Sequence, residues 1–117
     1  NEVNVRNGPG LNHLVIYKIL KKGYPLIIIS NFENWSKVSD INGAMGWISN
    51  SQLTEKKYVI ITSSYEYLYK FPNERSKKIA KVMKNFVLEN EKCNVEWCFV
   101  KEKEIEGWVR KKGIWGN

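Results

Sequence analysis

The sequence predicts an all-β protein made of two small domains of the same kind. The first observation is a glycine–tryptophan pair followed by a β-branched residue, which occurs at residues 46–48 and again at residues 107–109. The second is a W-x-x-V motif before each pair, at residues 35–38 and 97–100. The third is a proline that precedes this motif by 26 residues in one half and by 25 in the other. Landmarks repeated in the same order at nearly the same spacing are typical of duplicated structural units.

Short strands and turns follow one another in the first half. Residues 24–30 (YPLIIIS) predict a buried strand, residues 31–34 (NFEN) a turn, and residues 35–39 (WSKVS) an alternating strand. Residues 40–44 (DINGA) predict a hairpin turn, because Asn-Gly favours the two-residue turns that join antiparallel strands. Residues 45–49 (MGWIS) predict the returning strand.

The second half repeats this order of elements. Residues 85–93 predict a strand, 94–96 a turn, 97–102 a strand, 103–106 a turn and 107–111 the returning strand. In both halves the glycine before the tryptophan permits a bulge or a close backbone approach where a small sheet must curl.

Two segments also fit a helix. Residues 74–86 carry apolar side chains at positions i, i+3, i+4 and i+7, which is the spacing of an amphipathic helix. Residues 11–23 are compatible with a helix that ends at a glycine. The repeat instead favours a turn followed by a strand in both places, and this is the structure that we expect.

The repeat divides the chain into domains at residues 1–54 and 58–117, joined near residues 54–58. We expect about five short strands in each domain and no helix longer than about two turns. The connection lacks the Gly and Ser of a flexible linker, and each domain alone is near the lower size limit for a core that folds unaided. The two domains are therefore expected to pack together rigidly.

Composition argues against disorder and against a membrane-spanning helix. Hydrophobic residues make up 43% of the chain and aromatic residues 13%, which suits a folded core. The longest fully aliphatic run, residues 26–29, is far shorter than the roughly 20 residues that cross a bilayer. The chain starts at Asn1 without a basic and apolar leader, so we expect that any targeting signal has been cleaved or lies outside this sequence.

The net charge of +7 would suit an acidic partner such as nucleic acid, an anionic lipid surface or a wall polymer. However, 16 of the 19 basic residues are Lys, and the excess is spread as +3 over residues 1–57 and +4 over residues 58–117. Arginine is the residue that grips phosphate with a planar fork. The charge therefore disfavours a dedicated nucleic-acid surface.

The sequence lacks a catalytic constellation. His13 is the only histidine and stands in a turn-like stretch, and the first half contains no cysteine. The acidic residues of segments 89–91 and 102–106 alternate as solvated strand faces do, without an apolar pocket to shift their pKa. Two cysteines and one histidine do not make a zinc site, and phosphate-binding glycine loops are absent. We expect no enzyme activity, no metal and no cofactor.

Cys93 and Cys98 flank a four-residue turn between two predicted strands, so their thiols can face each other across a hairpin. If the chain is exported, a disulfide is the expected state. In a reducing cytoplasm the same residues would be two unrelated buried thiols. A redox-active pair is disfavoured, because the two-residue spacing of that motif is missing.

Aromatic residues recur at equivalent positions in the two halves. Trp47 and Trp108 are expected in the core or at the domain interface, because a small β-domain needs large side chains to fill it. Trp35 and Trp97 stand beside turns and are expected to be partly exposed. The tyrosines of residues 65–69 alternate along one strand face and are expected to help join the domains.

Several of these motifs resemble the bacterial SH3-like (SH3b) domain, whose pattern is N-V-R-x-G-P, a strand, W-x-x-V and G-x-x-G-W. The matching segments are VNVRNGPG (residues 3–10), VIYKILKKG (15–23), NWSKV (34–38) and GAMGWISNSQL (43–53). The second half keeps the ending of this pattern, in EWCFV and GWVRKKGIWG, but has YLYKFPN where N-V-R-x-G-P would stand. The pair, with its "WC" and closing "IWG", resembles a tandem family of exported SH3-domain proteins of Gram-negative bacteria.

The resemblance implies two tandem SH3-like small β-barrels and a non-catalytic binding role at the cell envelope, in the periplasm or otherwise exported. The implied partner is peptidoglycan or an envelope protein, with no nucleic acid and no membrane span. One alternative is an accessory targeting segment of a wall hydrolase. Another is a basic nucleic-acid-binding barrel, supported by the net charge and exposed aromatics alone.

The candidate ligand-binding residues are Arg6, Asn7 and Trp35. The polar loop at residues 6–10 neighbours the turn before Trp35 in SH3-type barrels. Arg6 would bond a carboxylate, Asn7 would supply an amide, and Trp35 would offer a flat apolar platform. The alternative is that Arg6 ties its own loop to the barrel.

Overall fold

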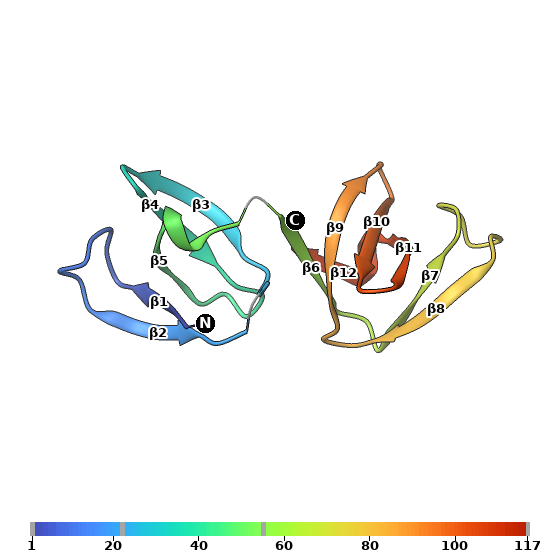
Figure 1. The fold of residues 1–117 in the computed structure, drawn as a ribbon, viewed down its shortest axis with the longest axis horizontal. Helices are drawn as coiled ribbons and strands as arrows, with labels where there is room; N and C mark the ends of the chain where they lie inside the picture. The colour runs from blue at the N-terminus through green and yellow to red at the C-terminus, as the bar shows by residue number, and fades with distance from the viewer. Residues whose placement is uncertain (1, 22, 55, 117) are drawn as a thin grey trace. The chain divides into compact units, whose positions relative to one another are not determined.

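A computed structural model describes residues 2–21, 23–54 and 56–116 and confirms the all-β fold. The chain forms two compact units, Asn1–Glu55 and Lys56–Asn117. Figure 1 shows each unit as a set of twisted antiparallel strands joined by turns.

Helical structure is restricted to single turns in the described part of the chain. Two short 3₁₀ helices, η1 (Asn50–Gln52) and η2 (Lys111–Gly113), each follow the strand that carries a glycine–tryptophan pair. None of the described residues belongs to a helix long and apolar enough to span a membrane. The expectation of no long helix is confirmed, and the segment at residues 74–86 contains a strand instead of the amphipathic helix.

The first unit is a five-stranded antiparallel sheet in the order β2-β1-β5-β4-β3. Asp40 closes the turn between β4 and β5, because its carboxylate accepts hydrogen bonds from the backbone amides of Asn42 (2.9 Å) and Ala44 (2.9 Å). Gly43 adopts a positive φ of 83° in this turn, so the predicted Asn-Gly hairpin is confirmed. The strands are β1 (Val3–Arg6), β2 (Val15–Ile19), β3 (Ile27–Phe32), β4 (Trp35–Ser39) and β5 (Met45–Ser49).

The second unit is a seven-stranded antiparallel sheet in the order β12-β6-β9-β10-β11-β7-β8. The expectation of about five strands holds only for the first unit, because the second has two further strands, β6 and β12. β6 pairs with both β9 and β12. The strands are β6 (Lys57–Ile61), β7 (Tyr65–Tyr69), β8 (Lys78–Met83), β9 (Val87–Cys93), β10 (Trp97–Glu102), β11 (Ile105–Arg110) and β12 (Ile114–Gly116).

The two units share one strand register, which confirms the repeat. The five strands of the first unit correspond to β7, β8, β9, β10 and β11 of the second. A one-residue bulge interrupts the ladder at the same place in β3 and in β9. Cross-strand pairs of the first unit have equivalents in the second. Trp35–Ser49 corresponds to Trp97–Arg110, Arg6–Trp47 corresponds to Tyr69–Trp108, and Ile28–Val38 corresponds to Asn90–Val100.

β3 is not the buried strand that its aliphatic sequence predicts. All six of its residues are exposed, with half of the Ile28 and Ile29 surface accessible to solvent (51% and 50%). β3 is the edge strand of its sheet, whereas its counterpart β9 has β10 on one side and β6 on the other. The prediction was wrong because an aliphatic run indicates a buried strand only if neighbours cover it.

Each unit has its own hydrophobic core, and the two cores differ in size. The first contains four buried residues, Val5, Ile19, Val38 and Ile48. The second contains eight: Val59, Ile61, Leu68, Val82, Leu88, Cys98, Val100 and Val109.

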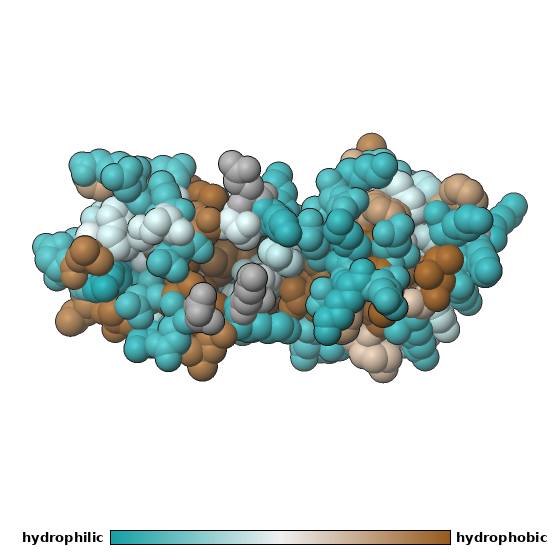
Figure 2. All heavy atoms as spheres, viewed as in Figure 1, coloured by the Kyte–Doolittle hydropathy of each residue, from teal (hydrophilic) through white to brown (hydrophobic). Residues whose placement is uncertain are grey.

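The larger core of the second unit leaves less apolar surface exposed. Ten of the fifteen large hydrophobic side chains that the described residues leave exposed belong to the first unit. Figure 2 shows such side chains among a largely hydrophilic surface. Trp47 and Trp108 are half-buried and lie outside both core clusters.

Candidate ligand-binding site

Arg6 closes the loop that follows β1. Its Nη1 donates hydrogen bonds to the backbone carbonyls of Leu11 (3.2 Å) and His13 (2.8 Å). A Cβ atom on Gly8 would lie 2.4 Å from the His13 ring, so this position must be glycine for the ring to lie there. The guanidinium of Arg6 is therefore bonded to its own loop, which is the structural alternative raised by the sequence.

Asn7 and Trp35 do not join Arg6 in one cluster of contacts. The Asn7 side chain is exposed, and its backbone amide donates to the Leu14 carbonyl (2.9 Å). Trp35 begins β4, is half-buried and opposes Phe32 across a tight turn. Within the residues that the structure describes, no hydrogen bond or ring contact connects the three predicted side chains.

The second unit has an aromatic ladder at the corresponding place. Tyr65, Tyr67, Tyr69 and Trp97 form this ladder through three edge-to-face contacts, with ring centroids 5.5, 6.3 and 5.5 Å apart in that order. The three tyrosines share a face because alternate residues of a strand point to the same side. Edge-to-face packing is a favourable geometry for aromatic rings. The alternation noted in the sequence is thereby confirmed.

The ladder contains the counterparts of two predicted site residues. Tyr69 occupies the position of Arg6, and Trp97 occupies the position of Trp35. The ring centroids of Tyr69 and Trp97 are 5.5 Å apart, and the two ring planes form an angle of 87°. The second unit therefore brings together an aromatic pair at the two positions that the sequence predicted as a ligand site in the first.

A buried ion pair lies behind the ladder. Glu66, only 3% exposed, accepts two hydrogen bonds from Arg110, one from Nε (3.1 Å) and one from Nη2 (2.9 Å). The hydrogen bonds to Glu66 favour the charged guanidinium and raise the pKa of Arg110. Nη1 of Arg110 lies 3.5 Å from a carboxylate oxygen of Glu74, in the loop between β7 and β8. Arg110 thus connects the strands β7 and β11 to this loop.

Gly113 makes room for the ion pair. A Cβ atom at this position would lie 2.3 Å from Oε2 of Glu66. In the first unit, the shared register places Val3 at the position of Glu66 and Ser49 at the position of Arg110. The ion pair is therefore a property of the second unit alone.

The ladder and the ion pair border an open groove of about 400 Å³. Its walls combine tyrosine rings, hydroxyl groups, two carboxylates and one guanidinium, which suits a ligand with both apolar faces and polar groups. No group of three metal-ligating side chains occurs in the described part of the chain. The lining residues are Ser63, Ser64, Tyr65, Glu66, Tyr67, Tyr69, Glu74 and Arg110.

Lysines of β8 lie over the exposed end of the ladder. Nζ of Lys78 is 4.2 Å from the centroid of Tyr67, and Nζ of Lys81 is 4.2 Å from the centroid of Tyr65. At these distances a cation is attracted to the face of an aromatic ring. The tyrosine faces are thus able to receive an ammonium group.

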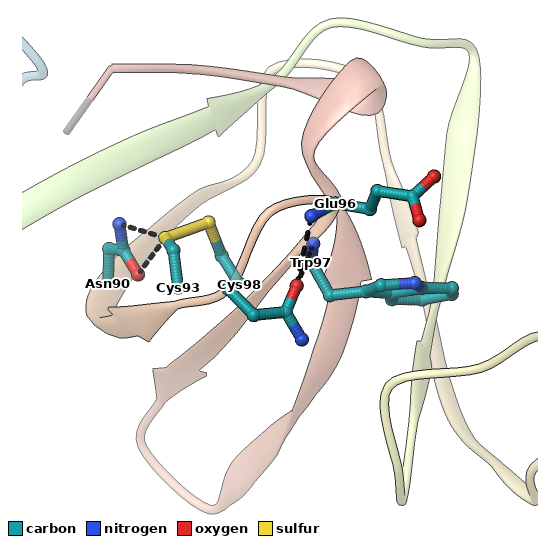
Figure 3. Close-up of a disulfide and its surroundings, with 6 residues drawn as sticks. Asn90, Cys93, Glu96, Trp97 and Cys98 are labelled. Carbon is teal, nitrogen blue, oxygen red and sulfur yellow. Dashed lines mark hydrogen bonds between the residues drawn. A yellow bond between two sulfur atoms is a disulfide. The ribbon is translucent and has the colours of Figure 1, made fainter.

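A disulfide fixes the hairpin that presents Trp97. Cys93 and Cys98 oppose each other in β9 and β10 and are bonded, which is compatible with an exported chain (Figure 3). The Asn94 side chain accepts hydrogen bonds from the backbone amides of Glu96 (2.9 Å) and Trp97 (2.7 Å), which closes the turn. The entry into β10, and with it the Trp97 ring, is held by both interactions.

Sequence reasoning missed Glu66, Glu74 and Arg110. Glu66 stands between two tyrosines on the opposite, inward face of β7, where an acid without a partner would be costly. That position was a usable signal, because a buried acid in a strand requires a cation. Arg110 could be recognised as this cation only if β7 was known to pair with β11. The sequence pattern does not predict that pairing.

Comparisons with known proteins identify the fold. The family model of the bacterial SH3 domain matches residues 1–55 and again residues 63–116. A search of the curated proteins finds no match.

Two solved structures are similar to parts or all of this chain. An NlpC/P60 family protein from Bacillus cereus is 21% identical over 77% of this chain, with a TM-score of 0.43. NlpC2 from Trichomonas vaginalis is 18% identical over the whole chain, with a TM-score of 0.48. The chain spans 35% and 44% of the lengths of these two proteins. The family match covers nearly all of both units, and the chain therefore belongs to the bacterial SH3 domain family, of which it contains two tandem copies.

Proposed function

We propose that this chain is a non-catalytic binding module of the bacterial cell envelope, which holds a fragment of peptidoglycan in the groove of its second unit. The observation that carries the proposal is the aromatic ladder beside the Glu66–Arg110 pair. Rings of this kind stack on sugar rings and on the apolar parts of peptides.

The chemistry of the groove matches the mixed nature of peptidoglycan. The ammonium group of a stem peptide would lie on a tyrosine face in place of one of the two lysines of β8. The hydroxyl groups of Ser63 and Ser64 and the largely exposed Glu74 offer hydrogen bonds to sugar hydroxyls and peptide amides.

The envelope location is supported by the family and by the disulfide. Disulfides persist in oxidising compartments and are rare in a reducing cytoplasm. The Cys93–Cys98 bridge fits a chain that is exported from the cytoplasm. Bacterial SH3 domains commonly serve as targeting or ligand-binding modules at the cell envelope. We propose this role for the tandem pair.

A cosedimentation assay tests the proposal with purified peptidoglycan and the full chain. Tyr67→Ala removes the central ring of the ladder and is expected to weaken binding at least about tenfold. Phe32→Ala, which removes an exposed aromatic side chain of the first unit, is the matched control and should bind like the unmodified chain. Circular dichroism melting checks that both variants are folded.

Arg6→Ala separates the two predicted sites. Because Arg6 is bonded to its own loop, its loss should lower the melting temperature and leave retention unchanged. Retention that vanishes for every variant in about 0.5 M salt would show that charge alone holds the protein to the wall. Equal retention of Tyr67→Ala and the unmodified chain would show that the groove does not bind peptidoglycan.

A further inference from the structure

The open edge of β3 occupies a position that is covered in the second unit. There, β6 lies alongside β9, the counterpart of β3, and pairs with it over four residues (Figure 1). Val59 and Ile61 of β6 are fully buried in the core of that unit. In the described part of the first unit, no strand pairs with β3 on this side.

The pairing of β6 shows which backbone groups of β9 face its partner. The amide of Ile61 donates to the carbonyl of Phe86 (3.0 Å), and the register then pairs Val59 with Leu88. Hydrogen-bonded pairs alternate along an antiparallel ladder. Leu88 therefore directs its backbone groups to β6, and so does Asn90 two residues later, whereas Val87 does not.

The shared register transfers this geometry to the first unit. Leu26 and Ile28 stand at the positions of Leu88 and Asn90, so their backbone groups face the open edge. Pro25 stands at the position of Val87, whose backbone groups point away from β6. A strand paired with the open edge of β3 would therefore need no amide hydrogen from Pro25. The proline therefore does not prevent a further strand from pairing.

Side-chain burial marks the same position. Leu88 is 1% exposed beneath β6, whereas its counterpart Leu26 is only half-buried. The six residues of β3 include no charged side chain, although charges are a usual means by which edge strands avoid pairing. β3 is thus an edge strand without charged side chains, and its bulge does not prevent pairing, because β9 has the same bulge and pairs with β6.

We propose that the edge of β3 binds an extended polypeptide strand of a partner protein, with uncharged aliphatic residues at alternate positions as in β6. The occupant would lie antiparallel to β3, as β6 lies against β9. Its backbone would bond Leu26 and Ile28, and its inward side chains would cover Leu26. This site belongs to the first unit and is independent of the peptidoglycan groove proposed for the second.

A synthetic peptide with the sequence of residues 56–63 tests the site, because β6 is the strand that occupies the equivalent position in the second unit. Binding to the full chain is measured by isothermal titration calorimetry and mapped by amide chemical shifts. The peptide is expected to bind and to shift the amides of Leu26 and Ile28. A control peptide with Lys in place of both inward residues, Val59 and Ile61, should bind at least about tenfold more weakly.

Two protein variants locate the site. Ile28→Pro removes an amide that faces the open edge and should weaken peptide binding at least about tenfold. Ile28→Lys adds a charge at the edge without changing the backbone, should weaken binding in the same way, and serves if the proline variant does not fold.

Three results would overturn the proposal. They are equal binding of both peptides, unchanged binding by the folded Ile28→Lys variant, and shifts that map to β9 because the peptide displaces β6. A dimer that forms through β3 without peptide, detected by light scattering and abolished by Ile28→Lys, would replace the proposed partner with a second copy of the chain.

Discussion

Equivalent residues perform different tasks in the two copies of the fold. Arg6 and Tyr69 stand at the same position, yet Arg6 bonds two carbonyls of its own loop and Tyr69 packs against Trp97. Ser36 and Asn31 stand where the second unit has the disulfide, and the Ser36 hydroxyl donates to the Asn31 side chain over 2.8 Å. The copies therefore share backbone geometry while their side chains have diverged.

The hydroxyl group of Tyr17 is a buried polar group without an assigned role. Among the described residues, it has no hydrogen-bond partner. Burial, followed by the negative charge of Asp40, raises the pKa of Tyr17. Burial, followed by the negative charge of Asp40, also raises the pKa of Tyr24.

We predict that Tyr17→Phe leaves stability unchanged or raises it by about 1 kcal/mol, because it removes an unsatisfied buried hydroxyl. A pKa raised in the folded state gives stability that is present below the unfolded value of about 10 and is lost as the pH rises above it. The variant should therefore lose less stability than the unmodified chain above pH 10. Denaturant titrations between neutral and alkaline pH measure both effects.

Tyr24→Phe is the matched control for this prediction. It removes a hydroxyl that interacts with the Asp40 side chain and should lower stability at neutral pH. The prediction fails if the two variants destabilise the protein equally, since the Tyr17 hydroxyl would then have a partner of its own.

Individual strands were predictable where the repeat and a turn signal agreed. β4, β5 and β10 have the bounds that the sequence indicated, because W-x-x-V, Asn-Gly and the glycine–tryptophan pair fix their ends. β6 was not predicted as a strand, because the described residues of the first unit include no counterpart with which to compare it. The burial of a strand depends on its neighbours, which is why β3 was assigned to the wrong environment.

The candidate site was predictable only in part. The tyrosine alternation of β7 and the facing cysteines could be read from local spacing. The groove also requires Arg110 to reach Glu66 across 44 residues of sequence, which depends on strand order. The ligand site at Arg6, Asn7 and Trp35 therefore stays a prediction, and the sequence did not identify the Tyr69–Trp97 ring contact at the equivalent positions of the second unit.

The β9–β10 hairpin depends on its disulfide. The Cys93–Cys98 bridge closes a short loop, and such a crosslink contributes about 2 kcal/mol by restricting the unfolded chain. We predict that replacing both cysteines by serine lowers the free energy of unfolding of the second unit by about this amount. Denaturant unfolding followed by tryptophan fluorescence measures the loss.

The first unit suggests a partial rescue of this loss. Asparagine at position 93 with serine at position 98 would reproduce the Asn31–Ser36 hydrogen bond and should recover part of the stability. A reducing agent should destabilise the unmodified chain and leave both variants unaffected. An equal effect of the reducing agent on all three proteins would show that the bridge is not the source of the difference.

The two copies of the fold have cores of unequal size. The second has eight buried core residues, a disulfide and a bidentate ion pair, whereas the first has four buried core residues and an open edge strand. Burial of apolar surface is the main favourable term in folding. The unit with the aromatic groove is thus the more firmly built of the two, which suits a site that must keep its rings in place.

We predict that backbone amides of β4 and β5 exchange with solvent at least about tenfold faster than those of β10 and β11, because local opening requires less free energy where fewer apolar contacts are lost. Hydrogen–deuterium exchange of the full chain, followed by mass spectrometry or NMR, measures both sets in one experiment. The double serine variant of the disulfide is the control, and its β10 and β11 amides should exchange faster while those of β4 and β5 remain unchanged. Equal protection of the two sets in the unmodified chain would contradict this prediction and would support the rigid packing expected from the short connection, since both units would then open together.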